Sequence, residues 1–399
     1  MTQREEVSKA ILDLPNSNIL AELPTGFGKS KIAIDLINKY CNKSSRILIV
    51  VPRLVLIENW KQEMKKWGCK IPVEFVTYVS FPKKLLLSKK DWDFVIFDEA
   101  HHLSERCRDA IAESSIKLNR ALLLSATINR ELRSELPYVF KDLYTYKISM
   151  KKAIEGDTLP DPEIILIPLK LDNAKVDHKI IRNKSAKKGE ITIDFKDRFK
   201  YKGIKDKKII IKCTQQQYYD DVESLIIWYK SKSYIEAMKN LWLRSCGDRN
   251  KWLSNQKTQF VYDLLKCLKN ERTLTFCNSI EHTTVLGSYA INSANKNSDS
   301  ILFKFNSKEI NHITACNILD EGANLTDCQY GIFAMLNSSE RMIIQKLGRL
   351  LRHQKPVVII PYYVGTRDEE LVKKMTENYK TTIINDLNEF KQWKQKKQK

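Results

Sequence analysis

Two short segments of the sequence carry residue types that could bind and hydrolyse a nucleoside triphosphate. The first reads T-G-F-G-K-S and stands between an apolar run and an amphipathic stretch. Glycines at this spacing let backbone N–H groups turn toward phosphate, the lysine can reach the β- and γ-phosphates, and the hydroxyl after it can hold Mg²⁺. The sequence therefore predicts an ATP-binding loop made of Thr25, Gly26, Phe27, Gly28, Lys29 and Ser30.

One position departs from the usual pattern of this loop. The motif G-x-x-x-x-G-K-[ST] begins with a glycine, and Leu23 occupies that place here. An ordinary turn is the alternative interpretation. The apolar run before the segment and the amphipathic stretch after it favour the phosphate-binding loop, because that loop joins a strand to a helix.

The second segment, W-D-F-V-I-F-D-E-A-H-H, has the pattern of a buried strand that ends in two acids. If the strand ends beside the phosphate loop, Asp98 can bind Mg²⁺ together with Ser30, and Glu99 can polarise the water that attacks the γ-phosphate. Taken alone, the segment could also be an acid-rich helix start. Together with the phosphate loop, it predicts an ATPase site.

Composition restricts the class of protein further. The 68 Lys+Arg against 48 Asp+Glu give a net charge of +20, which favours a polyanionic partner, although lysines that only keep the protein soluble would give the same count. No apolar run reaches the length of about 18 residues that spans a bilayer, and the start lacks a signal-peptide pattern. We expect a cytoplasmic protein without membrane contact. The nine cysteines form no C-x-x-C pair, so we expect neither zinc nor disulfides.

The elements that must position these residues alternate along the chain. Residues 1–148 and 256–399 each alternate short apolar runs with amphipathic stretches, the pattern of buried parallel strands followed by helices. Residues 149–255 differ: a single strand-like run is followed by a lysine-rich stretch and a helix-rich segment. We therefore expect an α/β fold of two tandem lobes with parallel sheets, joined by a connecting region with a basic insertion. The last residues, F-K-Q-W-K-Q-K-K-Q-K, are expected to form a frayed basic tail.

The order of these motifs resembles that of superfamily 2 helicases, and the resemblance continues through both lobes. L-L-L-S-A-T at 122–127 is similar to the family's coupling motif, L-D-E-G-A-N-L at 319–325 is similar to its motif before the last, and Q-K-L-G-R-L-L-R at 345–352 matches its closing motif Q-x-x-G-R-x-x-R. The resemblance implies two RecA-like lobes of the P-loop NTPase type, which use ATP and Mg²⁺.

Within the superfamily, three features are most similar to the UvsW, XPB and type III restriction groups. They are the DEAH-type acidic motif, the pattern V-P-x-x-x-L-I-x-N-W, and A-I-E-G-D-T-L-P-D-P after the first lobe. The acidic motif has His101 where the RNA-specific DEAD-box group has an aspartate, so DNA is favoured over RNA.

The resemblance also assigns roles. Arg349 and Arg352 lie three apart on one helical face and could stabilise charge on the γ-phosphate. Gln3 stands where many members carry the glutamine that reads the adenine edge. The implied catalytic residues are Lys29, Asp98, Glu99, Gln345, Arg349 and Arg352. The implied further nucleotide contacts are Gln3, Glu321 and Gly322, and the implied coupling residues are His101, Ser125 and Thr127.

Nucleic-acid contacts are expected from both lobes and from the basic insertion. In residues 174–212, 14 Lys+Arg stand against 5 Asp+Glu, which predicts either a basic hairpin that touches phosphates or a flexible solvated loop. The tryptophans of E-N-W and K-K-W have the spacing of core residues. The resemblance implies backbone contacts at Arg53, Thr77, Ser80, Asn278 and Ser279.

The sequence thus predicts an ATP-dependent helicase or translocase that acts on DNA, with possible protein partners in a replication, repair or recombination assembly. Three alternatives stay open: a duplex translocase subunit that does not separate strands, an RNA helicase, and a nucleic-acid-binding scaffold that has lost catalysis. No nuclease motif is evident in the sequence.

Overall fold

The structure is a computed structural model, and it describes the chain except residues 1, 15–17, 175, 182–207, 288, 317–324, 326, 337–347, 349, 351–352, 378 and 399. The chain divides into two compact units. Unit 1 comprises Met1–Pro162, Leu319–Cys328 and Ser339–Pro356, and unit 2 comprises Glu163–Ile318, Gln329–Ser338 and Val357–Lys399.

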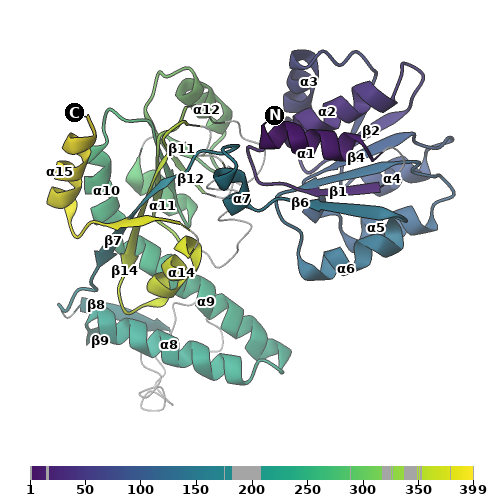
Figure 1. Ribbon diagram of the computed structural model, residues 1–399. Coiled ribbons are helices and arrows are strands. Elements are labelled where there is room, and N and C mark those ends of the chain that lie inside the picture. The colour runs from purple at the N-terminus through teal and green to yellow at the C-terminus, as the bar shows by residue number, and fades with distance from the viewer. Residues whose placement is uncertain are drawn as a thin grey trace. The chain divides into compact units, whose positions relative to one another are not determined.

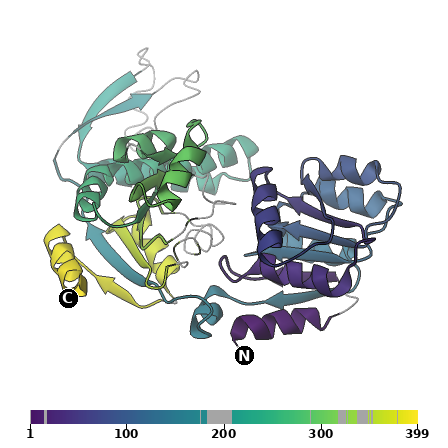
Figure 2. The same cartoon turned by 90° about the horizontal axis from the view of Figure 1, so that it is seen from above.

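Unit 1 is built on a parallel sheet of six strands in the order β3-β2-β4-β5-β1-β6. Helices lie on both sides of this sheet (Figures 1 and 2). Its central strands consist mostly of buried apolar residues, as in I-L-I-V-V of β2, because both faces are covered. The strands are β1 (Asn18–Glu22), β2 (Ile47–Val51), β3 (Glu74–Thr77), β4 (Phe94–Asp98), β5 (Ala121–Ser125) and β6 (Leu143–Lys147).

The helices of unit 1 bury one apolar stripe each. On α3, for example, Leu56, Trp60 and Met64 are four apart and buried, whereas the positions between them are more exposed. The helices are α1 (Gln3–Leu12), α2 (Lys29–Tyr40), α3 (Val55–Lys66), α4 (Phe81–Leu86), the 3₁₀ turn η1 (Ala100–His102), α5 (Glu105–Glu113), α6 (Arg130–Val139) and α7 (Met150–Glu155).

The strand order of unit 1 brings the predicted motifs together at one edge of the sheet. β5 pairs with β1 on one side and β4 on the other, with Glu22 opposite Ser125 and Asp98 opposite Leu124. Since all these strands are parallel, their carboxyl ends meet, and ligands of open α/β sheets bind there. The ends of the strands before the phosphate loop, the acidic motif and the coupling motif are therefore neighbours.

Unit 2 is built on a parallel sheet of seven strands in the order β11-β12-β10-β13-β14-β7-β15. Its strands are β7 (Glu163–Leu169), β10 (Thr273–Phe276), β11 (Ala290–Ile291), β12 (His312–Ala315), β13 (Tyr330–Phe333), β14 (Val357–Tyr363) and β15 (Thr381–Ile383). Its helices are α8 (Gln215–Ser231), α9 (Glu236–Gln256), α10 (Thr258–Cys267), α11 (Ile280–Leu286), α12 (Ser298–Asn306), α14 (Arg367–Thr376) and α15 (Leu387–Gln398).

The region between the two predicted lobes is divided differently from our expectation of a separate segment at 149–255. Residues up to Pro162 belong to unit 1, and the expected strand is β7, which lies between β14 and β15 in the second sheet. α8 and α9 run side by side around Val222, Leu225 and Ile226 (Figure 1). β8 (Val176–Ile181) and β9 (Lys208–Cys213) pair in antiparallel fashion at the two ends of the lysine-rich stretch.

The expectation of a frayed tail is wrong, because the last residues form α15, a helix docked on unit 2. Phe390 is fully buried, and the indole Nε1 of Trp393 donates to Glu163 Oε1 at 3.2 Å. Lys394 and Lys397 form ion pairs with Glu271 and Glu163, at 2.9 and 2.6 Å. The segment has apolar residues at helical spacing, and its many lysines made this pattern hard to recognise in the sequence.

Candidate nucleotide-binding and catalytic site

The predicted phosphate loop joins the end of β1 to the start of α2. Gly26 and Gly28 have φ of +89° and +102°, values that glycine adopts without strain, and Gly28 is the N-cap residue that precedes α2. The free N–H groups of the first turn of a helix stabilise a bound anion. Leu23, which replaces the first glycine of the motif, is fully buried, and its N–H donates to Ser125 O at 2.9 Å. The leucine therefore fits the loop as part of the sheet core.

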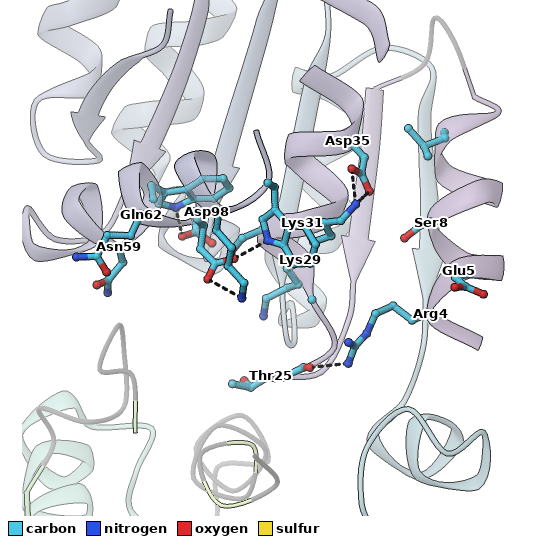
Figure 3. A pocket seen from close by; sticks show the side chains of 18 of the residues that line it. Arg4, Glu5, Ser8, Thr25, Lys29, Lys31, Asp35, Asn59, Gln62 and Asp98 are labelled. Atoms are coloured by element: carbon cyan, nitrogen blue, oxygen red, sulfur yellow. Dashed lines mark hydrogen bonds and ion pairs between the residues drawn. The ribbon is translucent and has the colours of Figure 1, made fainter. Parts of the chain in front are cut away.

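A cavity of about 990 Å³ lies against this loop, within unit 1. α1, α2, α3 and the end of β4 supply the other walls, and Figure 3 shows side chains from these elements around it. Phe27 differs from its neighbours in the loop because its side chain is fully buried in the core. The predicted residues that line the cavity are Thr25, Gly26, Gly28, Lys29, Ser30, Asp98 and Glu99.

Three of the charged residues predicted for catalysis lie together. Lys29 Nζ is 3.6 Å from Glu99 Oε1 and donates to Leu23 O at 3.4 Å. Burial raises the pKa of Asp98 above its usual range, and repulsion from the Glu99 carboxylate raises it further, whereas Trp60 and Lys29 lower it. Two carboxylates side by side, compensated by one lysine, form a site that attracts further positive charge.

Glu99 is held in an unusual backbone conformation. Its φ of 50° and ψ of 57° lie in the left-handed region, which costs a non-glycine residue about 1 kcal/mol. Its Oε2 atom is buried and has no hydrogen-bond donor among the residues that the structure describes. An oriented carboxylate oxygen without a donor, beside a phosphate loop, is suited to accept a proton from a water molecule.

The donor set fits a magnesium ion that binds together with ATP. Ser30 and Asp98 both line the cavity and offer a hydroxyl and a carboxylate oxygen, which are hard ligands. Mg²⁺ usually takes one or two protein carboxylates and completes its shell with phosphate and water, so the site needs no larger cluster. Within the described ranges no group of three or more His, Cys, Asp or Glu is arranged as a metal site.

The predicted coupling residues form a hydrogen-bonded chain at the end of β5. Ser125 Oγ donates to Thr127 O at 2.8 Å, and His101 Nδ1 lies 3.1 Å from the same Oγ. Because the single hydroxyl proton of Ser125 is used on Thr127, His101 Nδ1 is the donor in its pair. His101 Nδ1 also lies 3.5 Å from Glu99 Oε2. The chain of contacts thus connects Glu99 with the coupling motif.

The structure places Gln3 differently from a residue that reads adenine. Gln3 Nε2 donates to Lys152 O at 2.9 Å, and Gln3 Oε1 accepts from Thr158 Oγ1 at 2.9 Å. A Cβ atom on Gly156 would lie 2.5 Å from Gln3 Cδ, so the amide is enclosed by the segment after α7. Gln3 does not line the cavity, whereas its neighbour Arg4 does.

Arg4 was not predicted as a site residue, and it lies directly on the phosphate loop. Its Nη2 donates to Gly26 O at 3.3 Å, and its guanidinium group is within 4 Å of where a Cβ on Gly28 would lie. Figure 3 shows Arg4 reaching from α1 to the loop. Its position next to Gln3 was the only signal in the sequence.

Glu22 is a second residue that the sequence interpretation missed. Its side chain is 3% exposed, at the end of β1. Oε1 accepts from Ile128 N at 3.3 Å and lies 3.5 Å from Lys147 Nζ, and Oε2 forms an ion pair with Arg133. An acid at the end of the apolar run N-I-L-A-E-L was the signal, since a buried carboxylate requires partners.

The residues expected to meet nucleic acid lie near the carboxyl ends of strands. Arg53 is exposed after β2, and Thr77 Oγ1 lies 3.4 Å from Ser80 Oγ after β3, all in unit 1. In unit 2, Asn278 and Ser279 follow β10, and Ser279 Oγ accepts from His282 N at 3.1 Å as the cap of α11. The structure thus brings Thr77 and Ser80 together and gives Ser279 a structural role.

Several predicted residues lie outside the part of the chain that the structure describes. They are Glu321, Gly322, Gln345, Arg349 and Arg352. Gly348, from the same closing motif, is described and buried. A Cβ atom on Gly348 would lie 2.4 Å from Thr25 Cβ, so the glycine allows close approach to the phosphate loop.

Two family models match the chain. The model for "Type III restriction enzyme, res subunit" matches residues 2–71, and the model for "Helicase conserved C-terminal domain" matches residues 256–354. The first range contains the phosphate loop, and the second ends with the closing motif. These two matches, together with the relative described next, support a superfamily 2 helicase of the XPB and type III restriction type.

A curated protein similar to this chain is the DNA 3'-5' translocase XPB2 of Sulfurisphaera tokodaii. The two are 23% identical over 379 residues, which cover 89% of this chain and 80% of the relative. Among the described residues, no helix is both long enough and apolar enough to cross a bilayer.

Solved structures share the fold of two RecA-like lobes. S. cerevisiae Dbp5 bound to RNA and ADP BeF3 matches with a TM-score of 0.63 and 12% identity, over 100% of this chain and 94% of that one. The helicase domain of Pyrococcus furiosus Hef matches with a TM-score of 0.50 and 16% identity, over 94% of this chain and 99% of that one.

Proposed function

We propose that this superfamily 2 helicase is an ATP-driven motor that translocates on duplex DNA or remodels it. The observation that carries the proposal is the convergence of Lys29, Ser30, Asp98 and Glu99 on one cavity at the carboxyl edge of a parallel sheet. A scaffold that had lost catalysis would have no need of a strained glutamate beside the phosphate loop.

Each residue of the proposed ATP site has a separate role in hydrolysis. Lys29 binds the β- and γ-phosphate oxygens, and the N–H groups at the start of α2 surround the same phosphates. Glu99 orients the attacking water and accepts its proton through the oxygen that lacks a donor. Bound Mg²⁺, which Ser30 and Asp98 would hold, supplies charge neutralisation between the phosphates. Arg349 and Arg352 stabilise the negative charge that develops on the transferred phosphoryl group.

Hydrolysis is linked to movement through the coupling residues. When the water bound to Glu99 is consumed, the hydrogen bonds of His101 and Ser125 change, since His101 lies between Glu99 and Ser125. Ser125 and Thr127 pass this change along the segment after β5. Such a change can travel through contiguous contacts, here the 3.5 Å approach of His101 to Glu99 and the two hydrogen bonds of Ser125.

DNA is the favoured polymer for two reasons. The relative that matches most of this chain is named as a DNA translocase, and the net charge of +20 suits a polyanion. The likeness to Dbp5, solved with RNA, supports only the fold at 12% identity. Residues 174–212, together with Arg53, Thr77 and Ser80, are the proposed sites of backbone contact.

Displacement of a third strand from a triplex tests translocation, and displacement of one strand from a fork tests unwinding. The proposal predicts ATP-dependent displacement in the triplex assay that Lys29→Ala abolishes. Activity on the fork as well would extend the function to strand separation. An enzyme that moves RNA strands and leaves both DNA substrates intact would contradict the proposal.

A further inference from the structure

Two aromatic residues hold Asp98 at separate points. The indole Nε1 of Trp60 donates to Asp98 Oδ2 at 2.8 Å, and the hydroxyl of Tyr78 donates to Asp98 O at 2.9 Å. Trp60 is 3% exposed and Tyr78 is 6% exposed, so packing fixes both donors. The sequence pattern had indicated only a core role for Trp60, and its spacing on α3 is indeed that of a core residue.

The geometry of the Trp60 bond determines what remains of the carboxylate for a ligand. Because Oδ2 accepts the indole N–H, the rotation of the carboxyl group is restrained, which fixes the directions in which its oxygens can bind a ligand. Hydrogen bonds to a metal-ligating group from neighbouring residues are a general means of orienting the ligand.

Each of the two aromatic residues lies in a segment that also carries proposed nucleic-acid contacts. Trp60 lies on α3, which begins just after Arg53, and Tyr78 stands between Thr77 and Ser80. Arg53, Thr77 and Ser80 are the proposed nucleic-acid contacts of unit 1. The two donors therefore connect each of these segments with the acidic end of β4.

We propose that Trp60 is a positioning residue that orients the Asp98 carboxylate for Mg²⁺, and that Tyr78 secures the backbone of the same residue. This inference rests on the proposed function, since it concerns the metal that accompanies ATP. It assigns to the two aromatic residues a role that is independent of core packing.

Binding of Mn²⁺, followed by electron paramagnetic resonance in the presence of ADP, tests the role of Trp60. The variant Trp60→Phe keeps an aromatic ring and removes the N–H. We expect it to weaken Mn²⁺ binding by about tenfold, the lower end of the effect of removing a partner of a metal ligand. Binding of a fluorescent ADP analogue in EDTA should be unchanged, because that measurement does not involve the metal.

Trp393→Phe is the matched control. Trp393 Nε1 also donates to a carboxylate, Glu163 Oε1 at 3.2 Å, but both residues lie in unit 2 and neither lines the cavity. This variant should bind Mn²⁺ like the wild type. Tyr78→Phe removes the second contact, and we expect it to weaken Mn²⁺ binding by about fivefold, the equivalent of one hydrogen bond.

The outcomes are distinguishable. Mn²⁺ binding by folded Trp60→Phe at wild-type strength would overturn the inference while leaving the proposed function intact. If Trp60→Phe does not fold, Tyr78→Phe decides, and wild-type Mn²⁺ binding by that variant would overturn the inference. If the wild type binds neither ADP nor Mn²⁺, the proposed function itself fails.

Discussion

The ammonium group of Lys29 lies 3.6 Å from Oε1 of Glu99, and both side chains are largely buried, at 11% and 17% exposure. The lysine of the phosphate loop thus neutralises the residue proposed to activate water. When phosphate enters the cavity, Lys29 can turn to it and leave Glu99 free to accept a proton. The same lysine therefore has a role before and during hydrolysis.

Replacement of Lys29 tests this relationship. We expect Lys29→Ala to lower the rate of ATP hydrolysis by at least about 100-fold, the loss typical of removing one group that stabilises transition-state charge. Lys61→Ala is the control, since Lys61 is 59% exposed and its ion pair in the described part of the chain is with Glu58 at 3.9 Å. Steady-state phosphate release measures both variants, and hydrolysis retained by Lys29→Ala would contradict the assignment.

The contrast between Gln3 and Arg4 gives a second prediction. We expect Arg4→Ala to weaken binding of a fluorescent ADP analogue by about fivefold, the equivalent of one hydrogen bond of about 1 kcal/mol, because Arg4 lines the cavity and contacts the phosphate loop. Gln3→Ala should bind ADP normally and unfold at a lower temperature, since Lys152 O and Thr158 lose their partner. Weaker ADP binding by Gln3→Ala than by Arg4→Ala would restore the adenine-reading role to Gln3.

The buried carboxylate of Glu22 gives a third prediction. Glu22→Gln preserves shape but removes the charge opposite Arg133 and Lys147. Both cations are partly exposed, so water compensates in part, and we expect a loss of about 1–2 kcal/mol in the free energy of unfolding. Urea denaturation measures the change, with Glu58→Gln as the exposed control. No difference between the two variants would show that the Glu22 ion pairs add nothing to stability.

Two histidines of unit 2 predict how stability depends on pH. Burial lowers the pKa of His282 and of His312 to about 4 from the ordinary value of 6.5. Between these values the unfolded chain binds more protons than the folded one, so stability falls as pH decreases from 6.5 toward 4. Between the folded and unfolded pKa values, each histidine changes the free energy of unfolding by up to about 1.4 kcal/mol per pH unit.

Urea denaturation at several pH values checks this prediction. His312 Nε2 lies 3.2 Å from Thr275 Oγ1, and a His312→Gln variant keeps a polar group there without the titration. That variant should show a smaller loss of stability on acidification than the wild type. A free energy of unfolding that is flat between pH 6.5 and 4.5 in the wild type would contradict the account.

Contiguous features were predictable from the sequence, whereas contacts between distant segments were not. Short sequence patterns predicted the chemistry of the loop Thr25–Ser30 and of the pair Asp98 and Glu99, because glycines, lysine and acids occur there at fixed spacing. Apolar runs likewise indicated the parallel strands. The partners of Trp60 and Glu22 depend on which strands and helices become neighbours, and periodicity alone carries no such information.

Three differences from expectation have the same physical origin. β7 joins the second sheet because it pairs with β14, which lies far along the chain, so its own residues could not assign it to a lobe. The carboxyl-terminal helix is fixed by Phe390 and Trp393 against unit 2, although its composition suggested a solvated tail. Gln3 similarly has the sequence position of an adenine reader but contacts the segment after α7.

The central claim is that this chain couples ATP hydrolysis at Glu99 to a DNA partner. The most direct test is the steady-state ATPase rate of the wild type and of Glu99→Gln without polymer and with single-stranded, duplex or branched DNA or RNA, at two salt concentrations. The account predicts that DNA stimulates the wild type, more strongly at low salt, and that Glu99→Gln loses this stimulation. A rate that is the same with every polymer and in both proteins would contradict it and indicate a binding scaffold.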